Sequence, residues 1–291
     1  MPSQNIQWFP GHMARTRRLM SENLKNVDAV IELLDARIPY SSRNPEIVRL
    51  CEDKPSIILL NKASLADLAV TRAWAKALTN EKTVCIETDC ISGTGLSQIA
   101  PALRQLCGEK LERYEQKGMT GRALKAMVVG IPNVGKSSLI NKLSGNKKAK
   151  VENRPGVTLD KQWVSTNIGI LLLDMPGVLW PKFEDPVVGE NLAITGAIKD
   201  DILDIETVAM TLCGRLRAMY PELFSQRYKL GEIPSEEDMD NYDLLSLVGK
   251  KRGFLMGGGE VNLERTANML LDEFRAAKIG RISLDQPRED A

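Results

Sequence analysis

The chain has 291 residues, enough for an α/β domain and a smaller second domain that each bury a core. Its 39 basic and 38 acidic side chains nearly cancel, and no apolar run approaches the roughly 20 residues that span a bilayer. The N-terminal segment carries basic residues without an apolar stretch after them, which argues against a secretory signal. We therefore expect a cytoplasmic protein with no membrane segment.

The five cysteines are scattered without C-x-x-C spacing. His12 is the single histidine and cannot complete a zinc site with them, so we expect reduced, structural thiols.

Short runs rich in Val, Ile and Leu predict buried strands at residues 27–34, 56–60, 84–88, 126–129 and 168–173. Segments with helical spacing lie between them, at residues 66–78 and 95–115. This alternation predicts an α/β fold with a doubly wound, mostly parallel sheet.

Strand signals stop after residue 186. Apolar residues then recur at helical spacing over residues 202–219 and 263–277, with proline and glycine between the segments. The predicted organisation is an α/β domain over residues 1–185 and an all-α domain over residues 186–291.

A phosphate-binding loop is the strongest motif in the chain. Gly130-x-x-x-x-Gly135-Lys136-Ser137 lies between a predicted strand and a helical run. Glycines let the backbone wrap a phosphate chain, Lys136 reaches the outer phosphates, and the Ser137 hydroxyl can bind Mg²⁺. The nucleotide contacts expected from this loop are Asn133, Val134, Gly135, Lys136, Ser137 and Ser138.

Two further motifs follow the phosphate loop. The run LLLDMPG ends a strand in Asp174, a position that holds Mg²⁺ in phosphate-loop proteins, and its Gly177 can sense the γ-phosphate. Thr158 lies between these motifs in a loop with proline and glycine, where its hydroxyl could complete the Mg²⁺ shell. An ordinary loop hydroxyl is the alternative.

The base-reading motif stands on the unexpected side of the phosphate loop. Residues 57–68, IILLNKASLADL, contain Asn61, Lys62 and Ser64 at the spacing of the guanine-reading motif of GTPases. In most such proteins this motif follows the phosphate loop. The chain therefore corresponds to a cyclic shift of the usual order, which a parallel sheet tolerates because termini can move between exposed loops.

With this order, the segments WFPGHMAR, DARIPYSSRNP, GIPNVGKSSLIN, DMPGVLWPKFED, KRGFLMGGG and GRISLDQP closely resemble the circularly permuted bacterial ribosome biogenesis GTPase A family. The resemblance covers nearly the whole chain. It implies a GTPase that hydrolyses GTP to GDP, requires Mg²⁺ and takes part in late assembly of the large (50S) ribosomal subunit. It also implies that the C-terminal helices contact ribosomal RNA.

The resemblance implies two further roles. His12 would be a catalytic residue on the ribosome, in addition to Lys136, and Asn133 would bind K⁺. We place His12 in a turn formed by residues 8–12. A surface or packing histidine and an ordinary turn asparagine are the respective alternatives.

Two positions depart from the usual GTPase pattern. Ser64 replaces the aspartate that accepts two hydrogen bonds from guanine, and whether Asp67 substitutes for it stays open. Val178 stands where many GTPases carry a glutamine that orients water, and an aliphatic side chain cannot do this.

Basic residues gather near both ends of the chain, and we expect those near the C-terminus to contact RNA: Lys250, Lys251, Arg252, Arg275, Lys278 and Arg281. The expected partner is the large ribosomal subunit with its RNA, and the protein is expected to be monomeric off the ribosome. Two alternatives remain: a GTP-gated RNA-binding placeholder in which hydrolysis is incidental, and an ATPase or small-molecule kinase.

Overall fold

The computed structural model describes residues 10–119, 121–145 and 163–287, with side chains from residue 14 onward. Its centre is a six-stranded sheet in the order β3-β2-β1-β4-β6-β5. The strands are β1 (Ala29–Asp35), β2 (Ser56–Asn61), β3 (Thr83–Glu87), β4 (Leu124–Val129), β5 (Trp163–Ser165) and β6 (Ile170–Asp174). All neighbouring strands are parallel except β5 and β6.

The strand order confirms the predicted α/β fold and its cyclic shift. The phosphate loop follows β4, which lies centrally between β1 and β6. Asp35 pairs with Asn61 across β1 and β2, and Val128 pairs with Asp174 across β4 and β6. The motifs that are scattered along the sequence therefore meet at the carboxyl end of one sheet. The sequence missed β5, because three residues at a sheet edge carry too little periodicity to detect.

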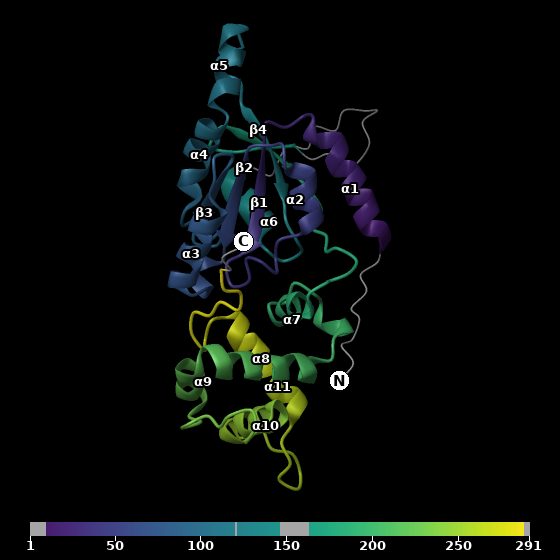
Figure 1. Cartoon of the computed structure of the whole chain (residues 1–291), viewed down its shortest axis with the longest axis vertical. Helices are drawn as coiled ribbons and strands as arrows, with labels where there is room; N and C mark the ends of the chain where they lie inside the picture. The colour runs from purple at the N-terminus through teal and green to yellow at the C-terminus, as the bar shows by residue number, and fades with distance from the viewer. Residues whose placement is uncertain (1–9, 120, 146–162, 288–291) are drawn as a thin grey trace.

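Helices cover both faces of the sheet (Figure 1). They are α1 (Pro10–Leu24), α2 (Pro45–Cys51), α3 (Leu68–Leu78), α4 (Ile99–Leu106), α5 (Gly108–Gln116) and α6 (Lys136–Ser144). The single helical segment expected over residues 95–115 is divided between a 3₁₀ turn at Leu96–Gln98, α4 and α5. The expected turn over residues 8–12 is corrected in part, because α1 begins at Pro10 and places His12 in its first helical turn.

The C-terminal part is helical, as expected. It contains α7 (Pro186–Ile194), α8 (Ile205–Met219), α9 (Pro221–Tyr228), α10 (Asn241–Arg252) and α11 (Leu263–Arg275). Asp185, Asp204, Asp240 and Asn262 cap α7, α8, α10 and α11 by accepting hydrogen bonds from backbone amides of the first turn. Among the described residues, no helix is long and apolar enough to cross a membrane.

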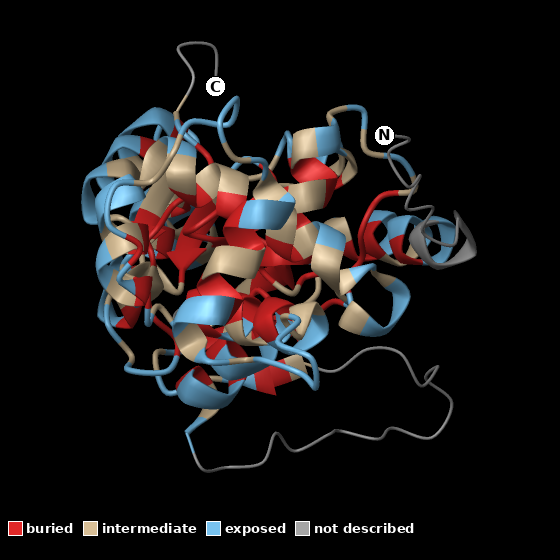
Figure 2. Ribbon diagram, turned by 90° about the horizontal axis from the view of Figure 1, so that it is seen from below, coloured by how far each residue is buried: buried red, intermediate tan, exposed pale blue. Residues whose placement is uncertain are grey.

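The helices and the sheet share a buried core. Ile31 and Ile57 of the sheet belong to the same hydrophobic cluster as Leu212, Phe224 and Leu270 of the C-terminal helices. Figure 2 shows buried segments running through the interior of the molecule. Packing therefore continues across the boundary predicted between residues 185 and 186, and the division into two domains stays a prediction.

The end of the chain returns to the sheet. The Ile282 amide donates to the Leu65 carbonyl at 3.2 Å, and the Leu284 amide donates to the Arg37 carbonyl at 2.8 Å. The buried Asp285 carboxylate accepts hydrogen bonds from the amide and hydroxyl of Ser41 and from the Asn191 side chain. The C-terminal segment thus joins the loop after β1 to α7.

All five cysteines lie in the described part of the chain and are free, and four of them are buried. Burial raises the pKa of the Cys51 and Cys90 thiols to about 12, which keeps them protonated. The expectation of structural thiols is confirmed.

Candidate nucleotide-binding site

The phosphate loop turns tightly between β4 and α6. Gly130 and Gly135 have φ values of 146° and 105°, a region that side chains rarely adopt, and a Cβ on Gly135 would overlap the Asn61 side chain. Asn133 also has a positive φ, 61°. Because α6 begins at Lys136, the loop amides and the positive end of that helix converge where a phosphate chain would lie.

Lys136, Gly177 and Asp174 lie together beside this loop. Lys136 is buried, and its ammonium donates to the Gly130 carbonyl at 3.1 Å and the Ile131 carbonyl at 2.7 Å. A Cβ on Gly177 would overlap Lys136 Nζ and approach Pro132 N to 3.0 Å, so a larger residue there would force the lysine side chain and the phosphate loop to shift. Gly177 is therefore packed against the phosphate loop, as its proposed sensing role requires.

Electrostatics couples the same residues. Burial lowers the pKa of Lys136 to about 8, while the Asp174 carboxylate opposes this change. Burial raises the pKa of Asp174, and Lys136 and the Met175 amide act in the opposite direction. Each group thus favours the charged form of the other.

Asn61 connects the base-reading segment to the phosphate loop. Its Nδ2 donates to the Val134 carbonyl at 2.6 Å, and its Oδ1 accepts from the Cys90 amide at 2.9 Å. This buried side chain therefore joins the end of β2, the loop after β3 and the phosphate loop. Its expected place at the nucleotide site is consistent with this geometry.

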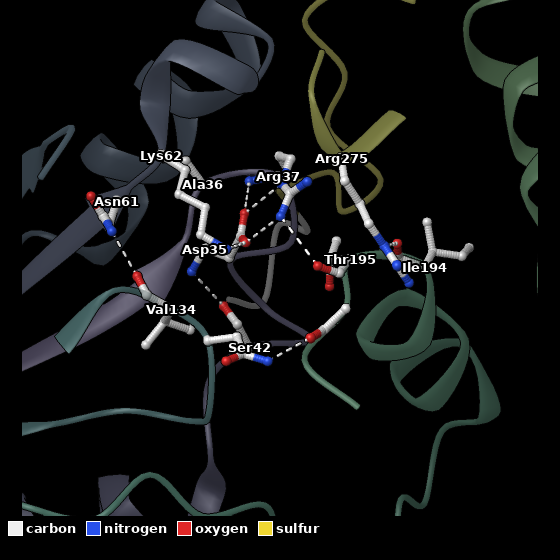
Figure 3. Close-up of polar contacts among 12 residues, drawn as sticks. Asp35, Ala36, Arg37, Ser42, Asn61, Lys62, Val134, Ile194, Thr195 and Arg275 are labelled. Atoms are coloured by element: carbon white, nitrogen blue, oxygen red, sulfur yellow. Dashed lines mark hydrogen bonds and ion pairs between the residues drawn. The ribbon is translucent and has the colours of Figure 1, made fainter. Parts of the chain in front are cut away.

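A buried charge cluster that no sequence motif indicated lies next to Asn61 (Figure 3). Asp35, at the end of β1, accepts two hydrogen bonds from the Arg37 guanidinium, at 2.9 and 2.7 Å. Lys62, predicted to contact the nucleotide, also donates to Asp35, at 2.9 Å. A pocket beside this cluster is lined in part by Asp35, Lys62, Asn133 and Thr195, so it lies between the phosphate loop and the end of α7.

Two contacts join the nucleotide site to the C-terminal helices. Asn133 Nδ2 donates to the Gly196 carbonyl, just after α7, at 2.8 Å. Arg37 lies over the Phe274 ring of α11, 5.5 Å from its centroid, and approaches the Thr195 carbonyl at 3.5 Å. The phosphate loop and the loop after β1 are thereby in direct contact with the helical part.

At Ser64, the structure shows which carboxylate lies nearby. The Ser64 hydroxyl donates to Asp89 Oδ2. Asp67, the alternative left open by the sequence, caps α3 by accepting from the amides of Ala69 and Val70. Asp89 was not anticipated, because only the fold brings the end of β3 beside Ser64.

The predicted RNA-contact residues have different environments. Lys250, Lys251, Lys278 and Arg281 are exposed. Arg252 instead pairs with Glu273 at 3.1 Å, and Arg275 pairs with Asp200 at 2.7 Å. Arg275 also donates to the carbonyls of Ala193 and Ile194, so the two arginines have structural roles inside the protein.

Three remaining positions concern catalysis. Val178 is buried and aliphatic, so its side chain cannot orient water. Thr158 lies outside the described residues, and His12 is described only as part of the α1 backbone. Among the described residues, no cluster of His, Cys, Asp and Glu forms a metal site by itself.

The permuted sheet, the phosphate loop and the predicted base-reading residues Asn61 and Lys62 define a phosphate-loop GTPase. A family model described as "50S ribosome-binding GTPase" matches residues 125–212. Ribosome biogenesis GTPase A of Bacillus licheniformis is 48% identical over 284 residues, which cover 98% of this chain and 99% of that relative. The chain belongs to the ribosome biogenesis GTPase A family, and it is therefore a GTP-hydrolysing protein of ribosome biogenesis.

More distant relatives also match nearly the whole chain. Mitochondrial ribosome-associated GTPase 1 of Mus musculus is 35% identical, with 96% of this chain and 90% of that protein covered. A solved structure titled as GDP-bound TM YlqF has a TM-score of 0.61 and 26% identity, covering 93% of this chain and 99% of that chain. The similarity therefore extends over both the sheet and the C-terminal helices.

Proposed function

We propose that this GTPase requires Mg²⁺ and acts in late assembly of the large (50S) ribosomal subunit, hydrolysing GTP to GDP when docked on the pre-subunit. The observation that carries this proposal is the hydrogen bond from Asn133 of the phosphate loop to Gly196, which follows α7. It supports a direct link between bound nucleotide and the helices that would contact RNA. The description of the matching family model, a 50S ribosome-binding GTPase, supports the large subunit as partner.

The residues around the phosphate loop fit a Mg²⁺ site. Ser137 lies in the first turn of α6, and Asp174 ends the neighbouring strand β6. Hydroxyl and carboxylate oxygens suit Mg²⁺, which keeps several waters and also binds substrate phosphates. Ser137, Asp174 and Thr158 would hold the ion, which would neutralise charge developing on the phosphates.

Asn133 fits a K⁺ ligand beside the phosphates. Its Nδ2 donates to the Gly196 carbonyl, and its Oδ1 is the acceptor atom that would bind the ion. A monovalent cation held there would supply positive charge that other GTPases obtain from an arginine finger.

We assign activation of the attacking water to His12. Val178 cannot perform this role, and α1 lies against α2 with its N-terminal end directed toward the C-terminal helices (Figure 1). Docking on the ribosome would position His12, so we expect hydrolysis to be faster on the ribosome than in the free protein. The protein would act as a monomer in the cytoplasm.

Single-turnover GTP hydrolysis with and without purified large subunits tests this function. We expect large subunits to stimulate wild-type protein, and His12→Ala to reduce the stimulated rate by about ten- to ten-thousand-fold, the range for one positioned polar group. Subunit binding, measured with a non-hydrolysable GTP analogue, should stay unchanged.

Two outcomes would contradict the proposal. Wild-type stimulation in the His12→Ala variant would exclude His12 as the water-positioning residue. If the protein binds large subunits tightly and only with GTP, but the subunits do not accelerate its GTP hydrolysis, the placeholder function would be favoured.

A further inference from the structure

Recognition of guanine requires hydrogen-bond acceptors at a defined edge of the base. Guanine presents its N1–H and its exocyclic 2-amino group side by side, and a carboxylate can accept from both. Ser64 stands where GTPases usually carry that carboxylate. A serine hydroxyl has no negative charge and accepts less strongly, so another group must complete the site.

Asp89 offers the missing carboxylate. Its Oδ2 accepts a hydrogen bond from the Ser64 hydroxyl, and its Oδ1 accepts from the amides of Ile91 and Ser92 at 2.9 and 3.0 Å. A carboxylate has about four acceptor positions, and these three hydrogen bonds leave about one of them, on Oδ2, for a ligand. Burial raises the pKa of Asp89, but these hydrogen bonds outweigh it and lower the pKa, which keeps the carboxylate ionised.

The loop that carries Asp89 is fixed to the phosphate loop. The next residue, Cys90, donates its amide to Asn61, and Asn61 donates to Val134 of the phosphate loop. Lys142 of α6 donates to the Ile91 carbonyl at 3.1 Å. Asp89 and the phosphate loop are therefore held at a fixed separation, as recognition of one nucleotide requires.

Asp67 carries the same number of hydrogen bonds, but its partners are different. Its Oδ1 caps α3, and the Tyr220 hydroxyl of the C-terminal part lies 3.5 Å from its Oδ2, whereas Asp89 accepts from Ser64 and lies on the loop that is bonded to Asn61. The Asp67 carboxylate therefore serves the helix start and the contact with the C-terminal part.

We propose that Asp89 supplies the carboxylate that reads guanine, with its Oδ2 accepting a hydrogen bond from the base edge that carries N1–H and the 2-amino group, and that Ser64 holds this carboxylate in place. The carboxylate would then come from the loop after β3 instead of from the fourth position of the base-reading motif. The inference rests on a guanine nucleotide being the ligand, as the GTPase function requires.

The test compares dissociation constants for GDP, xanthosine diphosphate and ADP. Xanthine carries a carbonyl in place of the 2-amino group, so Asp89→Asn would present an amide N–H to it and disfavour guanine. We expect this variant to change the ratio of xanthosine diphosphate to GDP affinity by about ten- to a hundred-fold in favour of xanthosine diphosphate, as for a hydrogen bond to a charged group. The ratio is insensitive to partial unfolding, which weakens binding of both ligands equally.

Two further variants sharpen the comparison. The double variant Ser64→Asp/Asp89→Ser returns the carboxylate to the usual position and should keep a ratio within about three-fold of wild type. Asp67→Asn is the matched acid-to-amide control and should leave the ratio unchanged.

A wild-type ratio in Asp89→Asn, or an equal change in Asp67→Asn, would overturn the assignment. Wild-type protein that binds ADP as tightly as GDP would instead contradict guanine nucleotide as the ligand, and the assignment with it.

Discussion

At the scale of single residues, the Asp35 carboxylate lies between two cations with almost no access to water. Burial alone would raise the pKa of Asp35, but the charges of Arg37 and Lys62 outweigh it and hold the pKa well below its usual 3.8. The unfolded chain therefore binds a proton more readily than the folded one. The stabilisation from this ionised carboxylate is present above about pH 4 and is lost as the pH falls further.

Asp35→Asn should lower the free energy of unfolding at pH 7 by about 3–5 kcal/mol, because it leaves Arg37 buried without its partner. Urea unfolding from pH 7 to pH 3 measures this. The difference in free energy of unfolding between wild type and variant should become smaller below pH 4. The control is Glu109→Gln, which removes an exposed ion pair with Arg113 and should cost less than about 1 kcal/mol. A difference in free energy of unfolding that stays constant with pH would show that the pKa of Asp35 is the same in the folded and the unfolded chain.

At the scale of one element, the three basic residues at the end of α10 have two different environments. Lys250 and Lys251 are exposed, whereas Arg252 pairs with Glu273 of α11 and lies 4.9 Å from the centroid of the Tyr228 ring. Positive charge at a helix C-terminus also complements the helix dipole. Charge clustering in the sequence therefore identified the cluster but could not separate surface cations from structural ones.

Lys250→Ala/Lys251→Ala should weaken binding to large subunits and reduce the slope of log affinity against log salt by about 2, because each lysine would neutralise one RNA phosphate. Subunit binding across a salt series measures both quantities. Arg252→Ala is the contrasting variant, expected to lower the free energy of unfolding by about 1–2 kcal/mol with little change in the slope. An unchanged slope in the double variant would exclude these lysines from the RNA interface.

At the scale of the whole molecule, the chain closes on itself through its C-terminal segment. Asp285 binds both Ser41 of the sheet region and Asn191 of α7, and its carbonyl accepts from the buried Trp74 at 3.1 Å. Arg275 of α11 donates hydrogen bonds to the carbonyls of Ala193 and Ile194 at the end of α7. We infer that the helices and the GTPase core unfold together.

Asp285→Ala should destabilise both parts by a similar amount, about 1–3 kcal/mol, because it removes the acceptor of the Ser41 amide and hydroxyl and one of the two acceptors of the Asn191 amide group. Hydrogen exchange of slow amides in β1 and in α8 measures each part separately. Arg281→Ala, an exposed change in the same segment, is the control and should alter neither. Faster exchange in only one part would show that the two unfold independently.

Local sequence patterns identified much of the fold and some of the site. Five strands, the helical C-terminal part and the phosphate loop were predictable because periodicity and glycine spacing are properties of short segments. The expected burial was wrong for β3, which lies at the edge of the sheet and buries only Ile86. The short edge strand β5 and the helical start of α1 at Pro10 were not, because both carry weak local signals.

The sequence by itself determined the class of protein and the order of its motifs, since each motif is contiguous and chemically distinctive. Only the tertiary structure decided which side chains act together. Asp89 meets Ser64 from 25 residues away along the chain, and Asn133 meets Gly196 from 63 residues away. Such pairs depend on strand order and loop packing, so no local pattern records them.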